Sequence, residues 1–291
     1  MRIVGIVGAG FMGSGIAEAM AVAGVRTVVH EPEPEPLDRS RERVGASVAR
    51  AVDRGKLDPA AASDALARLS YTTRFEDLEA CELVVEAVTE DVWIKTDVFR
   101  RLGETMPDEA ILASNTSSIP IADLAKAAGG SDRVLGLHFF SPVPVMKLAE
   151  VIPALGTAPG VVAAAEDLLR QIGKHPIRSP DRAGFVVNVL LVPYLVSAVR
   201  LYEEGFASRE DIDEGMRLGC GHPMGPLTLC DFIGLDVVDG ICRSLYEEHR
   251  RPEYAAPPLL RRMVAAGRLG RKSGHGFYDY AAPRAVVGAA A

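Results

Sequence analysis

The first two thirds of the chain alternate short apolar runs with amphipathic or alanine-rich stretches. The apolar runs have strand length, and they cover residues 2–7, 27–30, 83–88, 110–114, 134–140 and 148–152. Helical spacing is clearest over residues 11–24 and, after a proline-rich turn at 31–36, over residues 37–54. Continuous apolar strands separated by helices are typical of a parallel sheet covered on both faces. The pattern predicts an α/β domain with a mostly parallel sheet.

The pattern changes near residue 183, where strand signals nearly vanish. Helical candidates then cover residues 184–204, 208–219, 226–250 and 257–266, and the alanine-rich tail after Tyr280 is expected to be frayed. We therefore expect two domains, residues 1–182 and a smaller all-α domain at residues 183–291. The apolar run 185–199 is shorter than a membrane span and contains Asn188 and Pro193. It predicts a buried helix and no membrane association.

Composition narrows the class of protein. A chain of 291 residues with 48% hydrophobic and 24% charged residues is ordinary for a soluble globular protein of about two domains. The formal net charge of −7 argues against the broad basic surface of a nucleic-acid binder. The four cysteines form no C-x-x-C pair, so they indicate neither a metal site nor a redox motif. They predict a reducing, cytoplasmic compartment.

The strongest local motif is a glycine fingerprint between the first apolar run and the first helix. Gly8, Gly10 and Gly13 form G-x-G-x-x-G. Gly8 permits a tight turn, Gly10 lets the backbone approach a pyrophosphate, and Gly13 allows close packing of helix against strand. A helix N-terminus then faces the phosphates. This context predicts a Rossmann-type, doubly wound dinucleotide-binding domain rather than a plain glycine-rich turn.

An acidic residue ends the second predicted strand and bears on the choice of cofactor. Glu31 can accept hydrogen bonds from an adenosine ribose, and its charge repels a 2′-phosphate. Glu31 therefore favours NAD. The nearby Arg26 and Arg39 keep NADP as an alternative.

Oxidation of an alcohol requires a base near the hydroxyl group, and histidine suits neutral pH. His138 lies near the end of a predicted strand, where ligands bind in such sheets. Glu150, in the following apolar stretch, could orient its imidazole and stabilise the charged form. The alternative is a structural histidine beside an edge-strand glutamate.

Two further polar features lie in otherwise apolar surroundings. The hydroxyl-rich stretch 114–118 follows a predicted strand, so Ser117 and its neighbours could hold a substrate oxygen or simply cap the next helix. Asn188 lies on an apolar helix and needs a hydrogen-bond partner, which a substrate or the core could provide.

These and other motifs resemble, in order and over nearly the whole chain, the short-chain L-3-hydroxyacyl-CoA dehydrogenases, and more narrowly the bacterial 3-hydroxybutyryl-CoA dehydrogenases. The matching segments are GAGFMGSGIA (8–17), EAVTE (86–90), SNTSS (114–118), GLHFF (136–140), PVPVM (142–146), GFVVN (184–188), HPMGP (222–226) and GHGFY (274–278). The resemblance implies an NAD-binding domain, a helical domain that forms a homodimer, and an acyl-CoA substrate.

The resemblance also implies a role for each matching residue. His138 would be the general base of alcohol oxidation with Glu150 as its partner, and Ser117 and Asn188 would bind the reacting oxygen. The residues expected along the cofactor are Gly8, Gly10, Phe11, Met12, Gly13, Glu31, Glu90, Lys95, Ser117, Ser141 and Lys272. The residues expected to contact CoA, where the alignment is less certain, are Ser47, Arg54 and Lys56.

Two departures from the family pattern and three rival functions remain. Many members have Asn at Ser141 and Arg at Val189, which leaves cofactor affinity and the substrate undecided. A β-hydroxyacid dehydrogenase would place a catalytic lysine within residues 184–205, which contain none. A sister enzyme acting on a carrier-protein-bound thioester is a closer alternative. A dinucleotide-binding sensor would bind the cofactor without turnover.

Overall fold

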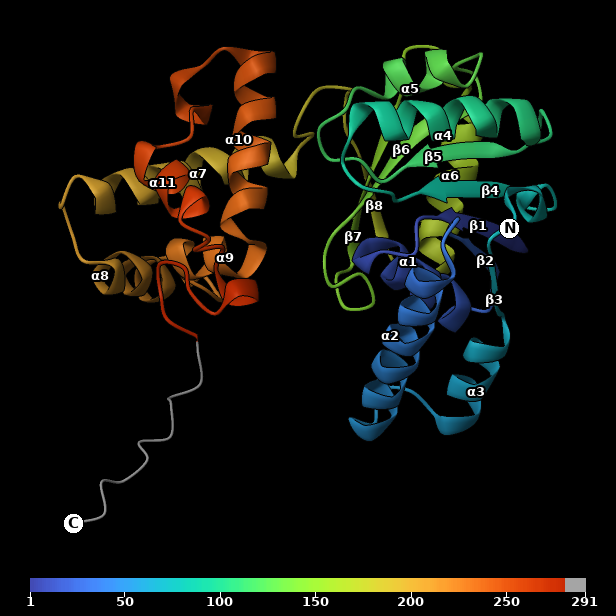
Figure 1. Ribbon diagram of the computed structural model, residues 1–291, viewed down its shortest axis with the longest axis horizontal. Coiled ribbons are helices and arrows are strands. Elements are labelled where there is room, and N and C mark those ends of the chain that lie inside the picture. The colour runs from blue at the N-terminus through green and yellow to red at the C-terminus, as the bar shows by residue number, and fades with distance from the viewer. Residues whose placement is uncertain (281–291) are drawn as a thin grey trace. The chain divides into compact units, whose positions relative to one another are not determined.

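The computed structural model describes residues 1–280, so the tail expected to be frayed lies outside the described residues. The chain divides into two compact units, Met1–Phe185 and Val186–Ala291. Figure 1 shows an α/β unit that carries the N-terminus and a unit made of helices.

The first unit is built on an eight-stranded sheet with the order β3-β2-β1-β4-β5-β6-β7-β8. The strands are β1 (Ile3–Val7), β2 (Arg26–His30), β3 (Leu69–Thr72), β4 (Leu83–Glu86), β5 (Ile111–Ser114), β6 (Val134–Phe139), β7 (Leu148–Pro153) and β8 (His175–Arg178). Strands β1 to β6 are parallel, β7 is antiparallel to β6, and β8 is parallel to β7. The mostly parallel doubly wound sheet is confirmed, and its first six strands have the order of dinucleotide-binding folds.

All six predicted strands are present, and two further strands form the edges of the sheet. The edge strands β3 and β8 contain no fully buried residue, whereas every residue of β4, β5 and β6 is buried. Hydrophobic runs are a strong signal only for strands covered on both faces. This explains why the sequence pattern missed the two edge strands.

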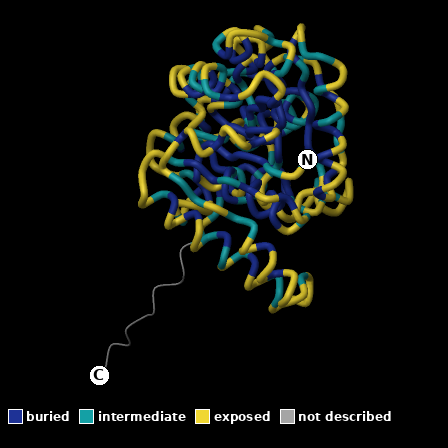
Figure 2. Tube along the Cα trace, turned by 90° about the vertical axis from the view of Figure 1, so that its right-hand side faces the viewer, coloured by how far each residue is buried: buried dark blue, intermediate teal, exposed yellow. Residues whose placement is uncertain are grey.

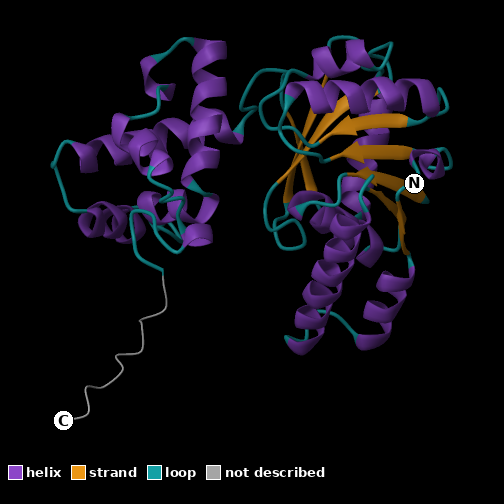
Figure 3. Ribbon diagram, in the orientation of Figure 1, coloured by secondary structure: helices purple, strands orange, loops and turns teal. Residues whose placement is uncertain are grey.

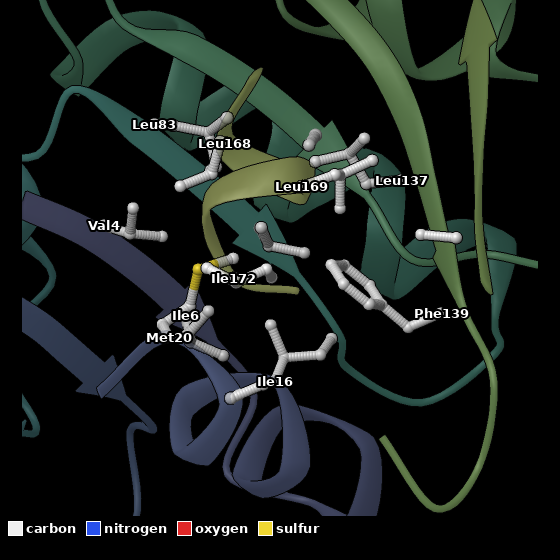
Figure 4. Close-up of a cluster of buried hydrophobic side chains, with 14 of the residues drawn as sticks. Val4, Ile6, Ile16, Met20, Leu83, Leu137, Phe139, Leu168, Leu169 and Ile172 are labelled. Carbon is white, nitrogen blue, oxygen red and sulfur yellow. The ribbon is translucent and has the colours of Figure 1, made fainter. Parts of the chain in front are cut away.

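Helices cover both faces of this sheet. Helices α1 (Phe11–Val22) and α6 (Pro159–Gln171) pack on one face, and α4 (Val92–Thr105) and α5 (Ile121–Ala127) pack on the other. Figure 4 shows Ile16 and Met20 of α1 and Leu168 and Leu169 of α6 meeting the strand side chains. Figure 2 colours the buried positions of the chain dark blue, and they include every residue of β4, β5 and β6.

Helix α2 (Pro34–Asp53) and helix α3 (Pro59–Ala67) form a hairpin between β2 and β3. The expected proline-rich turn at 31–36 is too long, because α2 already begins at Pro34. Proline fits the first turn of a helix, where its missing N–H has no intrahelical partner and its fixed φ suits the helix.

The second unit contains helices and loops in its described part (Figure 3). Its longer helical segments are α7 (Val187–Glu203), α8 (Arg209–Glu214), a π-helical turn (Gly215–Gly219), α9 (Pro226–Ile233), α10 (Leu235–His249) and α11 (Pro258–Ala265), and two 3-10 turns lie at Pro252–Tyr254 and Arg271–Ser273. The single helix expected at 226–250 is wrong, because the chain breaks at Gly234. The φ angle there is 105°, which only glycine adopts readily. Among the described helices, none is both long enough and apolar enough to span a membrane.

Candidate active site

The glycine turn between β1 and α1 has the close backbone contacts that the sequence predicts for Gly8 and Gly13. Gly8 has a φ of 107°, and a Cβ there would lie 2.6 Å from the carbonyl oxygen of Ala87, in the segment after β4. A Cβ on Gly13 would lie 1.9 Å from the carbonyl oxygen of Gly8. Both glycines therefore allow backbone segments to approach more closely than any side chain permits.

Gly10 has a different environment, since no described atom outside the adjoining backbone lies within 4 Å of where its Cβ would be. It is the N-cap of α1, and within residues 1–280 no side chain caps this helix end. The first-turn N–H groups of α1 are thus suited to an anion. Glu31 Oε2 accepts a hydrogen bond from the Ala9 N–H at 2.9 Å, so its carboxylate lies beside the turn. This arrangement fits a dinucleotide with a free ribose 2′-hydroxyl.

The pairing of His138 with Glu150 is present in the structure. Because β7 runs antiparallel to β6, the two residues lie directly opposite each other on neighbouring strands. His138 Nδ1 lies 2.7 Å from Glu150 Oε2. The hydrogen bond to a carboxylate places the proton on Nδ1 and leaves Nε2 as the acceptor of the neutral ring.

This pair is largely shielded from water. His138 is 7% exposed and Glu150 is completely buried. The rings of Phe140 and Phe185 pack against the imidazole, with centroid distances of 4.7 Å and 5.5 Å. Low local polarity strengthens the attraction between an imidazolium and the carboxylate.

The stretch after β5 is organised by Glu90. Its Oε1 accepts hydrogen bonds from the Thr116 hydroxyl at 2.5 Å, the Ser117 N–H at 3.0 Å and the Ser118 hydroxyl at 2.8 Å. Burial raises the pKa of the Glu90 carboxyl, but the Lys95 ammonium and these hydrogen bonds outweigh burial and hold that pKa below its usual value. Glu90 therefore carries a charge at neutral pH. Ser117 is the predicted ligand of the substrate oxygen, and its backbone N–H bonds it to Glu90.

Lys95 lies beneath this turn and is only 1% exposed. Its ammonium is 2.6 Å from Glu86 Oε1 and 3.3 Å from Glu90 Oε2, and it reaches the Val88 carbonyl oxygen at 3.4 Å. These bonds give Lys95 a structural role in the turn, and its direct contact with a cofactor stays a prediction. The sequence interpretation missed Glu86. A signal existed, since an acid ends an apolar strand and buried acids need partners.

The residues predicted to contact CoA lie on or just after α2. The Ser47 hydroxyl donates a hydrogen bond to Glu18 Oε1 of α1 at 2.9 Å. Burial raises the pKa of the Glu18 carboxyl, although the Ser47 hydrogen bond and the charges of Arg50 and Lys174 oppose it. Arg54 and Lys56 are exposed at the end of the helix. Their contact with CoA stays a prediction.

Three other predicted site residues lie in other segments of the chain. Ser141 is exposed after β6. In the second unit, Asn188 is 8% exposed in the first turn of α7, and Lys272 Nζ pairs with Asp236 Oδ2 at 2.6 Å. Their contacts with substrate or cofactor stay predictions. In the described part of the chain, no cluster of three acidic, histidine or cysteine side chains could hold a metal ion.

Comparison with known proteins gives the family. Residues 3–182 match the family model described as "3-hydroxyacyl-CoA dehydrogenase, NAD binding domain", and residues 184–280 match "3-hydroxyacyl-CoA dehydrogenase, C-terminal domain". The chain belongs to the 3-hydroxyacyl-CoA dehydrogenase family. The α/β unit is therefore the NAD-binding domain of an oxidoreductase, and the contacts of the glycine turn and of Glu31 with the cofactor stay predictions.

Individual members of the 3-hydroxyacyl-CoA dehydrogenase family are similar along nearly their whole length. A 3-hydroxybutyryl-CoA dehydrogenase of Mycobacterium tuberculosis is 50% identical over 279 residues, which is 95% of this chain and 98% of the relative. A probable 3-hydroxybutyryl-CoA dehydrogenase of Deinococcus radiodurans is 45% identical over 276 residues, 95% of this chain and 99% of the relative. The crystal structure of (S)-3-hydroxybutyryl-CoA dehydrogenase from Ralstonia eutropha superposes with a TM-score of 0.93 at 45% identity, covering 97% of this chain and all of that one.

Proposed function

We propose that the protein interconverts (S)-3-hydroxyacyl-CoA and 3-ketoacyl-CoA with NAD, in fatty acid metabolism, and that 3-hydroxybutyryl-CoA is its hydroxyacyl substrate. The observation that carries this proposal is the buried 2.7 Å pair of His138 and Glu150 at the carboxyl end of β6. The pair belongs to the same sheet edge as the glycine turn, and ligands bind at this edge in such sheets. The relatives described as 3-hydroxybutyryl-CoA dehydrogenases support the substrate.

His138 is the proton carrier of the proposed reaction. When NAD⁺ is bound, it supplies the acceptor for the hydride that leaves C3 of the substrate. His138 Nε2 removes the proton of the 3-hydroxyl group during oxidation and returns it during reduction. Glu150 holds the ring through Nδ1 and stabilises the imidazolium, since its carboxylate lies at 2.7 Å.

Ser117 and Asn188 position the reacting oxygen in this proposal. The Ser117 backbone N–H donates a hydrogen bond to Glu90 at 3.0 Å, so this part of the turn is held in place before substrate binds. Such positioning lowers the barrier, because the reacting groups lose little further freedom. Ser47, Arg54 and Lys56 are proposed to hold the CoA moiety, with the two cations near its phosphates.

One assay tests the substrate and the cofactor together. Oxidation of NADH is followed with acetoacetyl-CoA, and then with longer 3-ketoacyl-CoAs and with NADPH. We expect turnover with acetoacetyl-CoA and a higher kcat/KM for NADH than for NADPH, because Glu31 repels a 2′-phosphate. No turnover with any of these thioesters would favour a carrier-protein-bound substrate or a sensor that binds NADH without reaction.

We also propose that the protein is a homodimer formed through its helical unit. Leu190, Phe206 and Leu218 of this unit are 72%, 78% and 71% exposed. These are the most exposed large apolar side chains among the described residues of this unit, and burying them against a second copy would stabilise a dimer. Sedimentation equilibrium at micromolar concentration should give twice the 31.0 kDa chain mass, and a monomer there would refute this part of the proposal.

A cytoplasmic location completes the proposal. Cys81, Cys220, Cys230 and Cys242 are all free thiols, and three of them are buried. Burial raises the pKa of the Cys81 thiol to about 12, so it is unreactive at neutral pH. Free thiols of this kind suit a reducing compartment. Fractionation of cells that express the tagged protein tests the location.

A further inference from the structure

A buried carboxylate at the end of β4 has no role in the chemistry described above. Glu86 is 0% exposed, and each of its oxygens is bonded. Its Oε2 accepts a hydrogen bond from the Ser114 hydroxyl at 2.6 Å. Its Oε1 accepts hydrogen bonds from the Val88 N–H at 2.7 Å and from Lys95 Nζ at 2.6 Å. Three donors therefore satisfy the hydrogen-bonding capacity of this buried carboxyl group.

Glu86, Lys95 and Glu90 form one connected group of charges. The Lys95 ammonium lies between the two carboxylates, at 2.6 Å from Glu86 and 3.3 Å from Glu90. Two negative charges face one positive charge, so the group has a net charge of −1. Glu90 accepts a hydrogen bond from the Ser117 N–H, so one carboxylate of this group lies next to the turn that the proposed reaction uses.

We propose that Glu86, acting through Lys95 and Glu90, shifts the preference of the site toward the oxidised cofactor. This inference rests on the proposed function in one respect, that the nicotinamide end of the cofactor lies at the turns after β5 and β6. NAD⁺ and NADH have the same phosphates, riboses and adenine, and they differ by one positive charge on the nicotinamide ring. A net negative charge near that ring stabilises only the cation. Glu86 is thus a positioning residue, because it touches neither substrate nor cofactor.

The experiment is Glu86→Gln, with the dissociation constants of NAD⁺ and NADH measured by isothermal titration calorimetry. Glutamine keeps the size of the side chain and one acceptor oxygen while it removes the charge. We expect the ratio of the NAD⁺ constant to the NADH constant to rise about five- to tenfold, which a unit charge within about 10 Å of the ring produces at intermediate dielectric constants. The contribution of the phosphates cancels in this ratio.

Two further variants make the test decisive. Glu109→Gln removes an equal charge from an exposed residue before the amino end of β5, and it should leave the ratio unchanged. Glu90→Gln removes one charge of the same group from a side chain that is 40% exposed, and it should raise the ratio as Glu86→Gln does, even where the latter variant folds poorly. Equal weakening of NAD⁺ and NADH binding in Glu86→Gln and Glu90→Gln, or no change in either, would overturn the inference.

The outcome is independent of the substrate. Binding of the two cofactor forms is measured without a thioester, so the ratio is obtained even if acetoacetyl-CoA is not turned over. Loss of turnover in the wild-type protein would refute the proposed substrate, whereas an unchanged ratio refutes only the role of Glu86.

Discussion

Buried charged side chains in the cofactor unit are held by partners on neighbouring strands and turns. Glu150 faces His138 across a strand pair, and Glu86 faces Lys95 across a turn. An unpaired buried charge would cost several kcal/mol, so removing one partner leaves the other in an unfavourable state. We therefore expect substitutions at different buried residues to have different effects on catalysis and on stability.

The catalytic pair gives the first prediction. His138→Ala and Glu150→Gln should each lower kcat for acetoacetyl-CoA reduction at least about 100-fold, the usual contribution of general acid–base groups, with little change in KM. His175→Ala is the control, because His175 is an exposed histidine on the edge strand β8. Stopped-flow and steady-state kinetics measure the effect. Near-wild-type turnover in either variant would remove these residues from the mechanism.

Glu18 gives a prediction for stability against pH. Its carboxyl pKa is raised by burial, so the folded protein binds a proton there more tightly than the unfolded chain does. Stability from this group is present at low pH and is lost as pH rises through the raised pKa. Glu18→Gln should then raise Tm by about 1–3 °C at pH 7.5. The gain should shrink toward pH 4, and a gain that is independent of pH would contradict the assignment.

At this scale the sequence indicated most of the chemistry. Polar residues at strand ends are conspicuous, so the sequence alone singles out His138 and Ser117 as candidates, and their roles stay predictions. The pairing of His138 with Glu150 was predicted as well, but the hydrogen bonds of Glu90 to the turn and of Glu86 to Ser114 were not, because they join segments that are distant in the sequence. A single sequence does not show which distant residues are in contact, so it does not identify these partners.

At the scale of elements, the strand–turn–helix unit at the N-terminus separates structural from binding glycines. Gly13 is in contact with the turn itself, whereas Gly10 faces open space and already has a φ of −69°, which alanine adopts without strain. Two substitutions of the same kind should therefore have different effects.

We expect Gly10→Ala to fold with a Tm close to that of the wild-type protein but to bind NADH at least about tenfold more weakly, because its methyl group enters the space for the pyrophosphate. Gly13→Ala should lower the stability by about 2 kcal/mol or more, since its methyl group would overlap the Gly8 carbonyl oxygen. Differential scanning fluorimetry and calorimetric titration measure both effects. Equal losses of Tm in both variants would disprove the distinction.

The elements were predicted best where the hydrophobic pattern is continuous. The central strands and α1 follow directly from it, whereas the break at Gly234 did not, because residues 226–250 keep helical spacing on both sides. The direction of β7 was also beyond the pattern. An apolar strand reads the same in either direction, and the helix-free connection after β6 is what makes β7 antiparallel.

At the scale of the whole molecule, the net charge of −7 and the polyanionic ligands have to be reconciled. The overall charge repels a CoA thioester at long range, and only local donors can attract it. The exposed Arg54 and Lys56 are the proposed local cations, and their attraction depends on ionic strength. The screening length falls from about 30 Å at 0.01 M to about 3 Å at 1 M ionic strength.

The double variant Arg54→Gln/Lys56→Gln should raise KM for acetoacetyl-CoA about tenfold at low ionic strength and leave kcat unchanged. The difference should become small near 1 M salt, because exposed charges are then screened. Arg41→Gln is the control, since Arg41 lies on the same helix but pairs with Asp38 at 3.0 Å. An effect on kcat, or an equal effect in the control, would exclude these two cations as the CoA site.

The hairpin of β6 and β7 also determines how the catalytic pair tolerates change in length. His138 and Glu150 face each other only in one strand register, and a slip of one residue would turn the carboxylate to the opposite side of the sheet. Insertions or deletions within residues 140–147 are therefore acceptable only if the turn absorbs them. The sequence of this loop can therefore vary, while the backbone pairing of β6 with β7 keeps His138 opposite Glu150.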